Sequence, residues 1–194
     1  MPTTLPRPEG QYHCPVSSAE LIEHLKRNSL RNDLQVTLRS GATSSWYLDG
    51  KQTTFDGEGA WLVGRAVLEI LAPEVEAVGG MTLGADPVAL ASAMVAVQRE
   101  RQLRAFSVRK AAKGHGVPGR LAGPVRPGDV VAVVEDTTTT GGALAEAVEV
   151  VIAEGLRVVQ VISVVDRSGG TVKERFADSG IEFVGIVGMA DLEV

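Results

Sequence analysis

Two adjacent acids, followed by four threonines and two glycines, form the part of this sequence with the clearest chemistry. The acids are Glu135 and Asp136, and the segment Thr137–Gly142 follows at once. The preceding Val130–Val134 is typical of a buried strand, and a helical pattern begins after the glycines. Such a loop presents hydroxyls and unpaired backbone N–H groups at a helix N-terminus, which favours a phosphate. The acids repel an anion, so we expect them to accept hydrogen bonds from sugar hydroxyls. The segment therefore predicts a sugar-phosphate site.

Three other interpretations of this segment are less favoured. One is a generic strand–turn–helix with ordinary capping threonines, which does not explain why so many turn and capping residues are gathered here. A nucleoside-triphosphate P-loop would end in Gly-Lys followed by Ser or Thr, and a dinucleotide fingerprint would have spaced glycines. Neither pattern occurs in Thr137–Gly142.

A second group of titratable residues lies at 109–116, with the sequence RKAAKGHG. Such a dense set of cationic and titratable groups makes a concentrated anion trap. A charge run is usually a solvated loop, but this one follows an expected strand end in a chain whose net charge is −5. We therefore interpret it as part of the anion site.

Both segments resemble motifs of one family. The segment 130–143 resembles the phosphoribosyl pyrophosphate (PRPP) motif of type I phosphoribosyltransferases, in which the acid pair holds the ribose 2′ and 3′ hydroxyls and the loop wraps the 5′-phosphate. The segment 109–116 resembles the RKxxKxHG motif of the orotate phosphoribosyltransferases. The resemblance covers about Ser18 to Leu192, which is nearly the whole chain.

This resemblance implies transfer of the ribose 5-phosphate group of PRPP to orotate, giving orotidine 5′-phosphate and diphosphate in pyrimidine biosynthesis. It implies Mg²⁺ as cofactor, bound mainly through PRPP, and catalytic roles for Lys113, His115 and Asp136. It also implies a homodimer with shared active sites, in which the loop of Lys113 and His115 covers the partner's site. The implied PRPP contacts are Arg39, Arg109, Lys110, Lys113, His115, Glu135, Asp136, Thr137, Thr138, Thr139, Thr140, Gly141, Gly142 and Ala143.

The contacts to orotate implied by the resemblance are Thr139, Arg167, Tyr47 and Leu48. Arg167 would pair with the orotate carboxylate, which suits the fork of a guanidinium group. The plain alternative for Arg167 is a surface ion pair with an acid nearby in the sequence.

One position departs from the pattern of many relatives. Leu83 stands where they carry a lysine, so one cation for the diphosphate is missing. The backbone N–H groups of Gly80–Leu83 are the alternative, as a nest for the anion.

The elements that must position these residues alternate between strands and helices. Strands are expected at 75–78, 104–108, 130–135, 158–165 and 182–187, and helices at 17–30, 57–71, 86–102, 142–154 and 171–177. A further strand at 34–38 is followed by a turn and a returning strand at 46–49. This order predicts an α/β fold with a mostly parallel sheet flanked by helices. Its ligands would bind at the carboxyl ends of the strands.

We expect a single domain over residues 1–194 with the type I phosphoribosyltransferase fold, including a small N-terminal hood. Residues 1–15 are expected to form a loose arm, and the Gly- and Pro-rich segment 110–126 a long, mobile catalytic loop. His24 fits a surface or half-buried residue better than a metal ligand, since nothing with metal-ligand spacing surrounds it.

The amino-acid composition favours some classes of protein and excludes others. The apolar content of 44% suits a packed α/β core, and the single cysteine, Cys14, excludes an internal disulfide. We expect a cytoplasmic protein with small-molecule substrates and no nucleic-acid or membrane partner. Two alternatives stay open: a regulator that senses PRPP and binds nucleic acid, and a transferase for another base such as a purine. The first needs a basic face, and the second leaves Arg167 without a carboxylate to bind.

Overall fold

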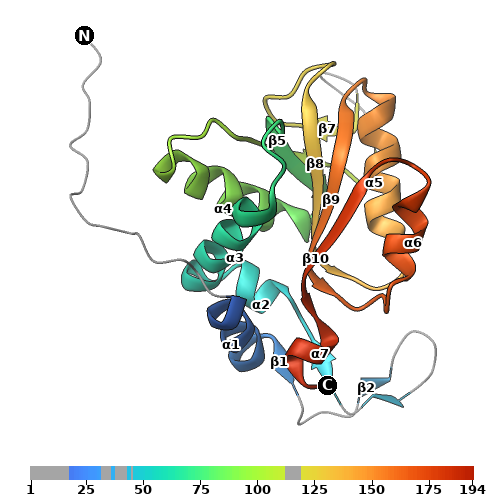
Figure 1. Cartoon of the computed structure of the whole chain (residues 1–194). Helices are drawn as coiled ribbons and strands as arrows, with labels where there is room; N and C mark the ends of the chain where they lie inside the picture. The colour runs from blue at the N-terminus through green and yellow to red at the C-terminus, as the bar shows by residue number, and fades with distance from the viewer. Residues whose placement is uncertain (1–17, 32–35, 38–42, 45, 112–118) are drawn as a thin grey trace.

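A six-stranded sheet forms the centre of the protein. The computed structural model describes residues 18–31, 36–37, 43–44, 46–111 and 119–194, which are drawn in colour in Figure 1. The strand order is β10-β9-β8-β5-β6-β7, and every neighbouring pair is parallel except β6 and β7. The strands are β5 (Ala77–Met81), β6 (Arg104–Val108), β7 (Leu121–Ala122), β8 (Val130–Thr138), β9 (Arg157–Asp166) and β10 (Glu182–Gly188). The mostly parallel sheet predicted from the sequence is confirmed.

Helices cover both faces of this sheet. Helices α3 (Gly57–Ile70) and α4 (Ala85–Gln98) lie on one face, and α5 (Gly142–Ala153) and α6 (Thr171–Ala177) on the other (Figure 1). Alternation along β8 explains the two cores, because Ala132 and Val134 pack toward α3 and α4, whereas Val131 and Val133 pack toward α5. In the described part of the chain, no helix is both long and apolar enough to cross a membrane.

The expected N-terminal hood is a group of short elements at the carboxyl edge of the sheet. It contains α1 (Ser18–Asn28), β1 (Leu30–Arg31), β4 (Tyr47–Leu48) and α2 (Lys51–Thr54), with α7 (Met189–Leu192) packed beside α1 (Figure 1). The strands β2 (Val36–Thr37) and β3 (Thr43–Ser44) form a separate antiparallel pair.

Strand pairing in the hood differs from the expectation. The returning strand at 46–49 was expected to follow a strand at 34–38, but β4 pairs antiparallel with β1, through Leu30 with Leu48 and Arg31 with Tyr47. Two-residue strands are too short for alternation to specify their register, so the sequence pattern could not reveal this partner. The helices α2 and α7 were also not expected, since four residues are too few for a helical period.

The long loop expected at 110–126 is not wholly irregular. Its described part contains β7, which pairs antiparallel with β6 through Ser107 with Ala122 and Val108 with Leu121. Main-chain hydrogen bonding to the open edge of β6 stabilises this strand, and no apolar alternation marks it in the sequence. Residues 112–118 of this loop and the arm at 1–15 lie outside the described residues.

Candidate active site

The acid pair lies at the carboxyl end of β8, which extends three residues beyond the expected strand. Glu135 and Asp136 are 8% and 3% exposed, so both carboxyl groups are buried inside the site rather than on its rim. Gly84, which precedes α4, lies against both of them, because a Cβ atom at this position would collide with Glu135 Oε1 and Asp136 Oδ1. The sheet end and the loop before α4 therefore meet at the two acids, as the sequence predicts.

The two acids have different surroundings. Asp136 accepts a hydrogen bond from the Thr137 backbone N–H through Oδ1 at 2.8 Å, and one from Lys51 Nζ through Oδ2 at 2.8 Å. Glu135 Oε2 is buried and has no hydrogen-bond partner among the described residues. Burial first, and then the negative charge of Asp136, raise the pKa of Glu135 to about 8. Near pH 7 the Glu135 side chain is therefore mostly protonated.

The threonine loop divides into a strand end and an exposed turn. Thr137 and Thr138 still belong to β8, whereas Thr139 and Thr140 are exposed. Gly141 has φ of +73° and is the N-cap of α5, with no side-chain hydrogen bond to the first turn. The capping role of the threonines, which was the plain alternative, is thus not observed. The first N–H groups of α5, including those of Gly142 and Ala143, have no side-chain cap and can receive an anion.

Gly141 is needed at this turn for two reasons. Its left-handed backbone is costly for residues with a side chain, and a Cβ atom there would lie 2.8 Å from Val172 Cγ2. The loop can reverse direction here and still pack on α6 only because the residue is glycine.

Aromatic and cationic side chains gather next to this loop. The guanidinium carbon of Arg167 lies 4.6 Å from the centre of the Trp46 ring, and the Arg167 backbone N–H donates to Thr138 O at 2.9 Å. Tyr47 is 42% exposed, whereas Leu48 is 4% exposed and belongs to the hydrophobic core. Of the predicted pair 47–48, only the Tyr47 side chain faces outward. Neighbouring residues of a strand point to opposite sides, so Tyr47 faces outward and Leu48 faces the core. The buried Leu48 side chain therefore offers orotate no exposed surface.

The basic segment is only partly described. The Arg109 backbone N–H donates to Arg120 O at 2.8 Å, and Arg109 Nη1 to Leu121 O at 3.2 Å, so β7 holds this arginine at the end of β6. Lys110 is exposed. Lys113, His115 and Arg39 lie outside the described residues, and their predicted roles stay predictions.

The loop at Gly80–Leu83 offers less to an anion than the sequence suggested. The Thr82 backbone N–H donates to Val108 O at 2.9 Å, and Gly80 lies in β5, opposite Ser107 of β6. The sheet therefore uses part of the predicted nest, and the role of its remaining N–H groups stays a prediction. Leu83 is 55% exposed and brings no charge to the site.

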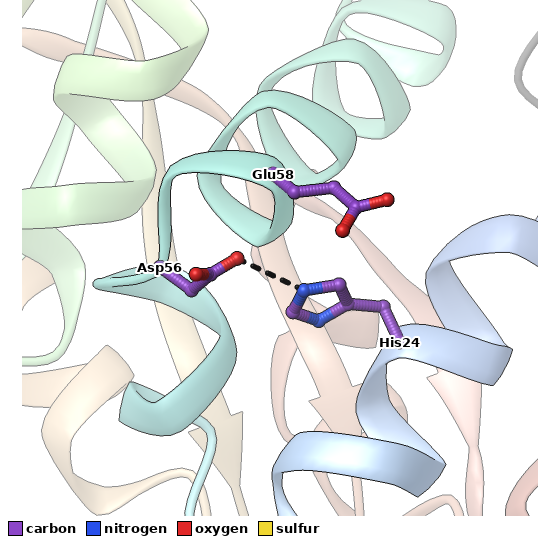
Figure 2. Close-up of side chains that lie close together, drawn as sticks. All are labelled: His24, Asp56 and Glu58. Atoms are coloured by element: carbon purple, nitrogen blue, oxygen red, sulfur yellow. Dashed lines mark hydrogen bonds and ion pairs between the residues drawn. The ribbon is translucent and has the colours of Figure 1, made fainter.

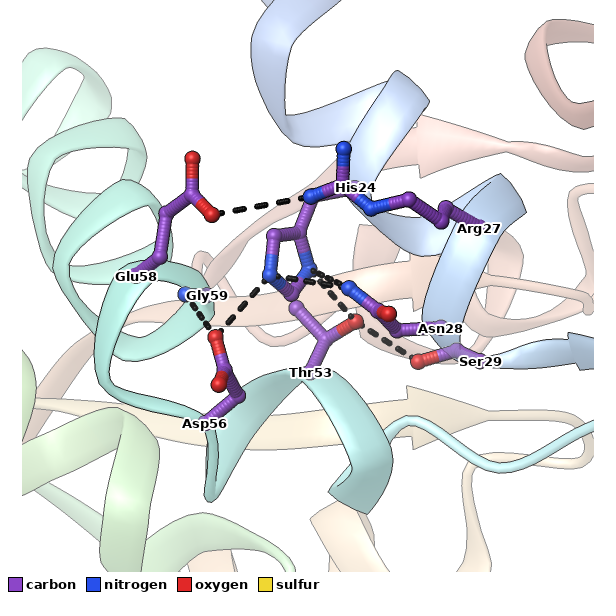
Figure 3. Close-up of polar contacts among 8 residues, drawn as sticks. All are labelled: His24, Arg27, Asn28, Ser29, Thr53, Asp56, Glu58 and Gly59. Carbon is purple, nitrogen blue, oxygen red and sulfur yellow. Dashed lines mark hydrogen bonds and ion pairs between the residues drawn. The ribbon is translucent and has the colours of Figure 1, made fainter.

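A second polar cluster joins α1 to the start of α3. His24 Nε2 lies 3.0 Å from Asp56 Oδ1, and the same oxygen accepts a hydrogen bond from the Gly59 N–H at 3.0 Å (Figures 2 and 3). His24 Nδ1 lies 3.2 Å from Thr53 Oγ1. The Gly59 hydrogen bond, followed by that with His24, lowers the pKa of Asp56. His24 is 2% exposed, so it is more deeply buried than expected.

The residue types of this cluster could bind a metal ion, but its side chains are already engaged with other protein groups. One ligand atom each of His24, Asp56 and Glu58 lie within 4.8 Å of one another (Figure 2). Glu58 is engaged with Arg27 at 3.5 Å, and both ring nitrogens of His24 have side-chain partners (Figure 3). We interpret the cluster as the connection that fixes α1, α2 and α3 to one another.

Comparison with known proteins identifies the family. No family model matches the chain. An orotate phosphoribosyltransferase of Streptomyces avermitilis is 47% identical over 164 residues, which cover 84% of this chain and 90% of that protein. The chain belongs to the orotate phosphoribosyltransferase family. An orotate phosphoribosyltransferase of Aquifex aeolicus is 39% identical over 176 residues, which cover 89% of this chain and 96% of that protein.

Solved structures of orotate phosphoribosyltransferases share the fold. The enzyme of Mycobacterium tuberculosis H37Rv in complex with Fe(III) dicitrate aligns with a TM-score of 0.82 and 39% identity, covering 91% of this chain and 99% of that one. The same enzyme in complex with PRPP aligns with a TM-score of 0.76 and 37% identity, with the same coverage. The type I phosphoribosyltransferase fold and membership of the pentosyltransferase enzymes, both predicted from the two motifs, are confirmed.

Sequence reasoning missed two residues that contact predicted site residues of this orotate phosphoribosyltransferase. Trp46 stacks on Arg167, and its position beside Tyr47 was the available signal. Lys51 contacts Asp136 across 85 positions of sequence, and nothing in its neighbourhood distinguishes it from an ordinary helix-starting lysine.

Proposed function

We propose that this chain transfers the ribose 5-phosphate group of PRPP to orotate, with the acid pair and the threonine loop holding the donor. Glu135 Oε2, which is buried and has no hydrogen-bond partner in the described segments, and the carboxyl group of Asp136 are suited to the hydroxyls of the ribose diol. The uncapped first turn of α5, with Thr139 and Thr140 exposed before it, is suited to the 5′-phosphate. The observation that carries the proposal is that both features meet at the end of one strand, β8.

Orotate would lie between this donor and the aromatic group of the hood. Arg167, stacked on Trp46, presents a planar guanidinium group to the orotate carboxylate, and Tyr47 is exposed beside it. Thr139 lies on the adjoining turn. This arrangement favours orotate over a purine, which carries no carboxylate.

In the reaction, orotate N1 loses its proton and forms a bond to the anomeric carbon of the ribose, while the bond from this carbon to the diphosphate oxygen breaks. The released diphosphate or water takes up the N1 proton. Positive charge builds on the ribose and negative charge on the leaving diphosphate. We assign the stabilisation of the leaving group to Lys113 and His115, assisted by Arg109, Lys110 and Arg39.

We further propose that Mg²⁺ is required. The acid pair fits such an ion, because oxygen atoms are its preferred ligands and Glu135 Oε2 has no partner within the described part of the chain. The ion would be held mainly through the diphosphate and hydroxyls of PRPP, with the acid pair beside it. When bound, it offsets the charge of the diphosphate.

We also propose a homodimer with shared active sites. Helix α4 begins directly after the loop at the acid pair, and it exposes Leu90, Met94 and Val97 by 58%, 71% and 73%. Their spacing places them on one side of the helix. An exposed apolar stripe of this kind is suited to a second copy of the chain.

The chain's net charge of −5 suits small-molecule substrates in the cytoplasm rather than nucleic acid. A direct assay tests the whole proposal. Purified protein with PRPP and Mg²⁺ is expected to consume orotate, followed as loss of its ultraviolet absorbance, and to release diphosphate. Consumption of hypoxanthine or uracil instead of orotate would contradict the assignment. Tight binding of nucleic acid without turnover would favour the regulator.

A further inference from the structure

Lys51 touches the acid pair but has no place in the contacts assigned so far. Its Nζ atom lies 2.8 Å from Asp136 Oδ2, and the two side chains are 42% and 4% exposed. The ion pair therefore runs from solvent to a buried carboxylate. Partial burial disfavours the ammonium, but the hydrogen bond and charge of Asp136 outweigh this effect and raise the pKa of Lys51.

The backbone at Lys51 is fixed from both sides. Before it, Gly50 packs so closely on β8 that a Cβ atom would lie 2.6 Å from Thr137 Oγ1. Asp49 Oδ1 accepts a hydrogen bond from the Lys51 N–H at 3.2 Å. After it, Thr53 is fully buried and hydrogen-bonded to Ser29 at 2.7 Å, within the network of Figure 3. The ammonium group is thus placed by a rigid support.

The need for a cation here follows from the charges that meet at this end of β8. Two neighbouring carboxyl groups are buried, and the donor that they must receive carries phosphate and diphosphate groups. The loop before α4 supplies no positive charge, since Leu83 is uncharged and exposed. Among the described residues, Lys51 is the one that forms an ion pair with the acid pair, through Asp136. It therefore offsets the repulsion between the acid pair and the entering anion.

Lys51 also gives the two acids different roles. With Oδ2 bound to Lys51 and Oδ1 to the Thr137 N–H, Asp136 is held in one orientation. Glu135 Oε2 receives no such donor from the residues that the structure describes. Asp136 is consequently the fixed acceptor of the pair, and its remaining lone pairs are available to a ribose hydroxyl.

We propose that Lys51 is a positioning residue for the transfer reaction, which orients Asp136 toward the ribose diol and offsets the charge of the acid pair as PRPP binds. The proposal rests on the proposed contact between the acid pair and the ribose hydroxyls. Lys51 acts through Asp136 and makes no bond to the reacting atoms.

The test compares Lys51→Met, which keeps the length of the side chain, with Lys51→Arg, which keeps its charge. PRPP binding is measured by calorimetry with excess Mg²⁺, and KM for both substrates by the absorbance assay. Lys51→Met is expected to weaken PRPP binding by about tenfold or more, as expected for loss of a charge-assisted hydrogen bond. KM for orotate should stay unchanged, and Lys51→Arg should recover most of the loss.

Two controls keep the result specific. Lys173→Met, on the exposed face of α6, should bind PRPP as the parent protein does. In an Asp136→Asn background, Lys51→Met should change PRPP binding by less than about twofold, because the partner of the lysine is already neutral. Thermal unfolding verifies that each variant folds, and Lys51→Gln replaces Lys51→Met if the latter does not.

Unchanged PRPP binding in Lys51→Met would overturn the role of Lys51. An equal loss in Lys51→Arg, or an undiminished loss in the Asp136→Asn background, would also overturn it. A parent protein that neither binds PRPP nor consumes orotate would instead refute the proposed function.

Discussion

At the scale of single residues, the site depends on two buried acids that are not equivalent. Asp136 has donors on both oxygens, whereas Glu135 is buried, has one oxygen without a partner in the described ranges, and has a pKa of about 8. A neutral Glu135 can both donate and accept a hydrogen bond. In the proposed complex this property would let the pair hold a diol without placing a second full charge beside an anionic donor.

Glu135 should make stability depend on pH. The folded protein binds this proton more tightly than the unfolded chain, so the free energy of unfolding should fall as the pH rises from about 4.5 to about 8. Glu135→Gln removes the ionisable group. The variant should therefore gain stability relative to the parent between about pH 5 and pH 9. Chemical denaturation at both pH values measures the difference, and a difference independent of pH would contradict the raised pKa.

At the scale of elements, the site is assembled by short segments that the hood holds over the sheet edge. Helix α2 carries Lys51 on its side toward the acids and Thr53 on its side toward His24. His24 in turn reaches Asp56, which caps α3 (Figure 3). The buried network thus connects the core of the hood to the acid pair through one turn of helix.

His24→Ala tests this connection. Removing the ring takes one hydrogen-bond partner from each of Thr53 and Asp56 and opens a cavity, so we expect a loss of about 2 kcal/mol or more in the free energy of unfolding. Lys26→Ala on the same helix removes only a partly exposed ion pair with Glu193 and should cost less than about 1 kcal/mol. Equal losses in the two variants, measured by urea denaturation, would show that the network adds nothing.

The strands and helices with a clear apolar period were predictable from the sequence, and the elements of two to four residues were not. The strand at 104–108 and the helix at 171–177 have their predicted bounds, because apolar periodicity specifies them. The acid pair and Gly141 could be placed because a strand, a turn and a helix follow one another there. Lys51 and Trp46 could not be assigned their contacts, since these depend on how the two-residue strands of the hood pair.

At the scale of the whole molecule, the proposed homodimer would join two sheets through the exposed side of α4. The apolar stripe of Leu90, Met94 and Val97 lies on α4, whose first residue, Ala85, follows Gly84 at the acid pair. Burial of this stripe would stabilise the dimer and the geometry of both sites together.

Mixing of inactive subunits tests the shared site. Lys113→Ala should reduce turnover by about a hundredfold or more, the usual cost of losing one preorganised electrostatic group. Mixed dimers of Lys113→Ala with Asp136→Asn should recover part of the activity, because one of the two sites contains neither substitution. Met94→Glu in both subunits should prevent the recovery by disrupting the dimer. Absence of recovery in demonstrably mixed dimers would count against a loop that acts across the interface.

The most direct measurement of the central claim is a crystal structure with PRPP and Mg²⁺ bound. The ribose hydroxyls are expected at Glu135 and Asp136, with the 5′-phosphate in the turn Thr137–Gly142 at the start of α5. PRPP bound elsewhere, with neither the acids nor this turn in contact with it, would contradict the account.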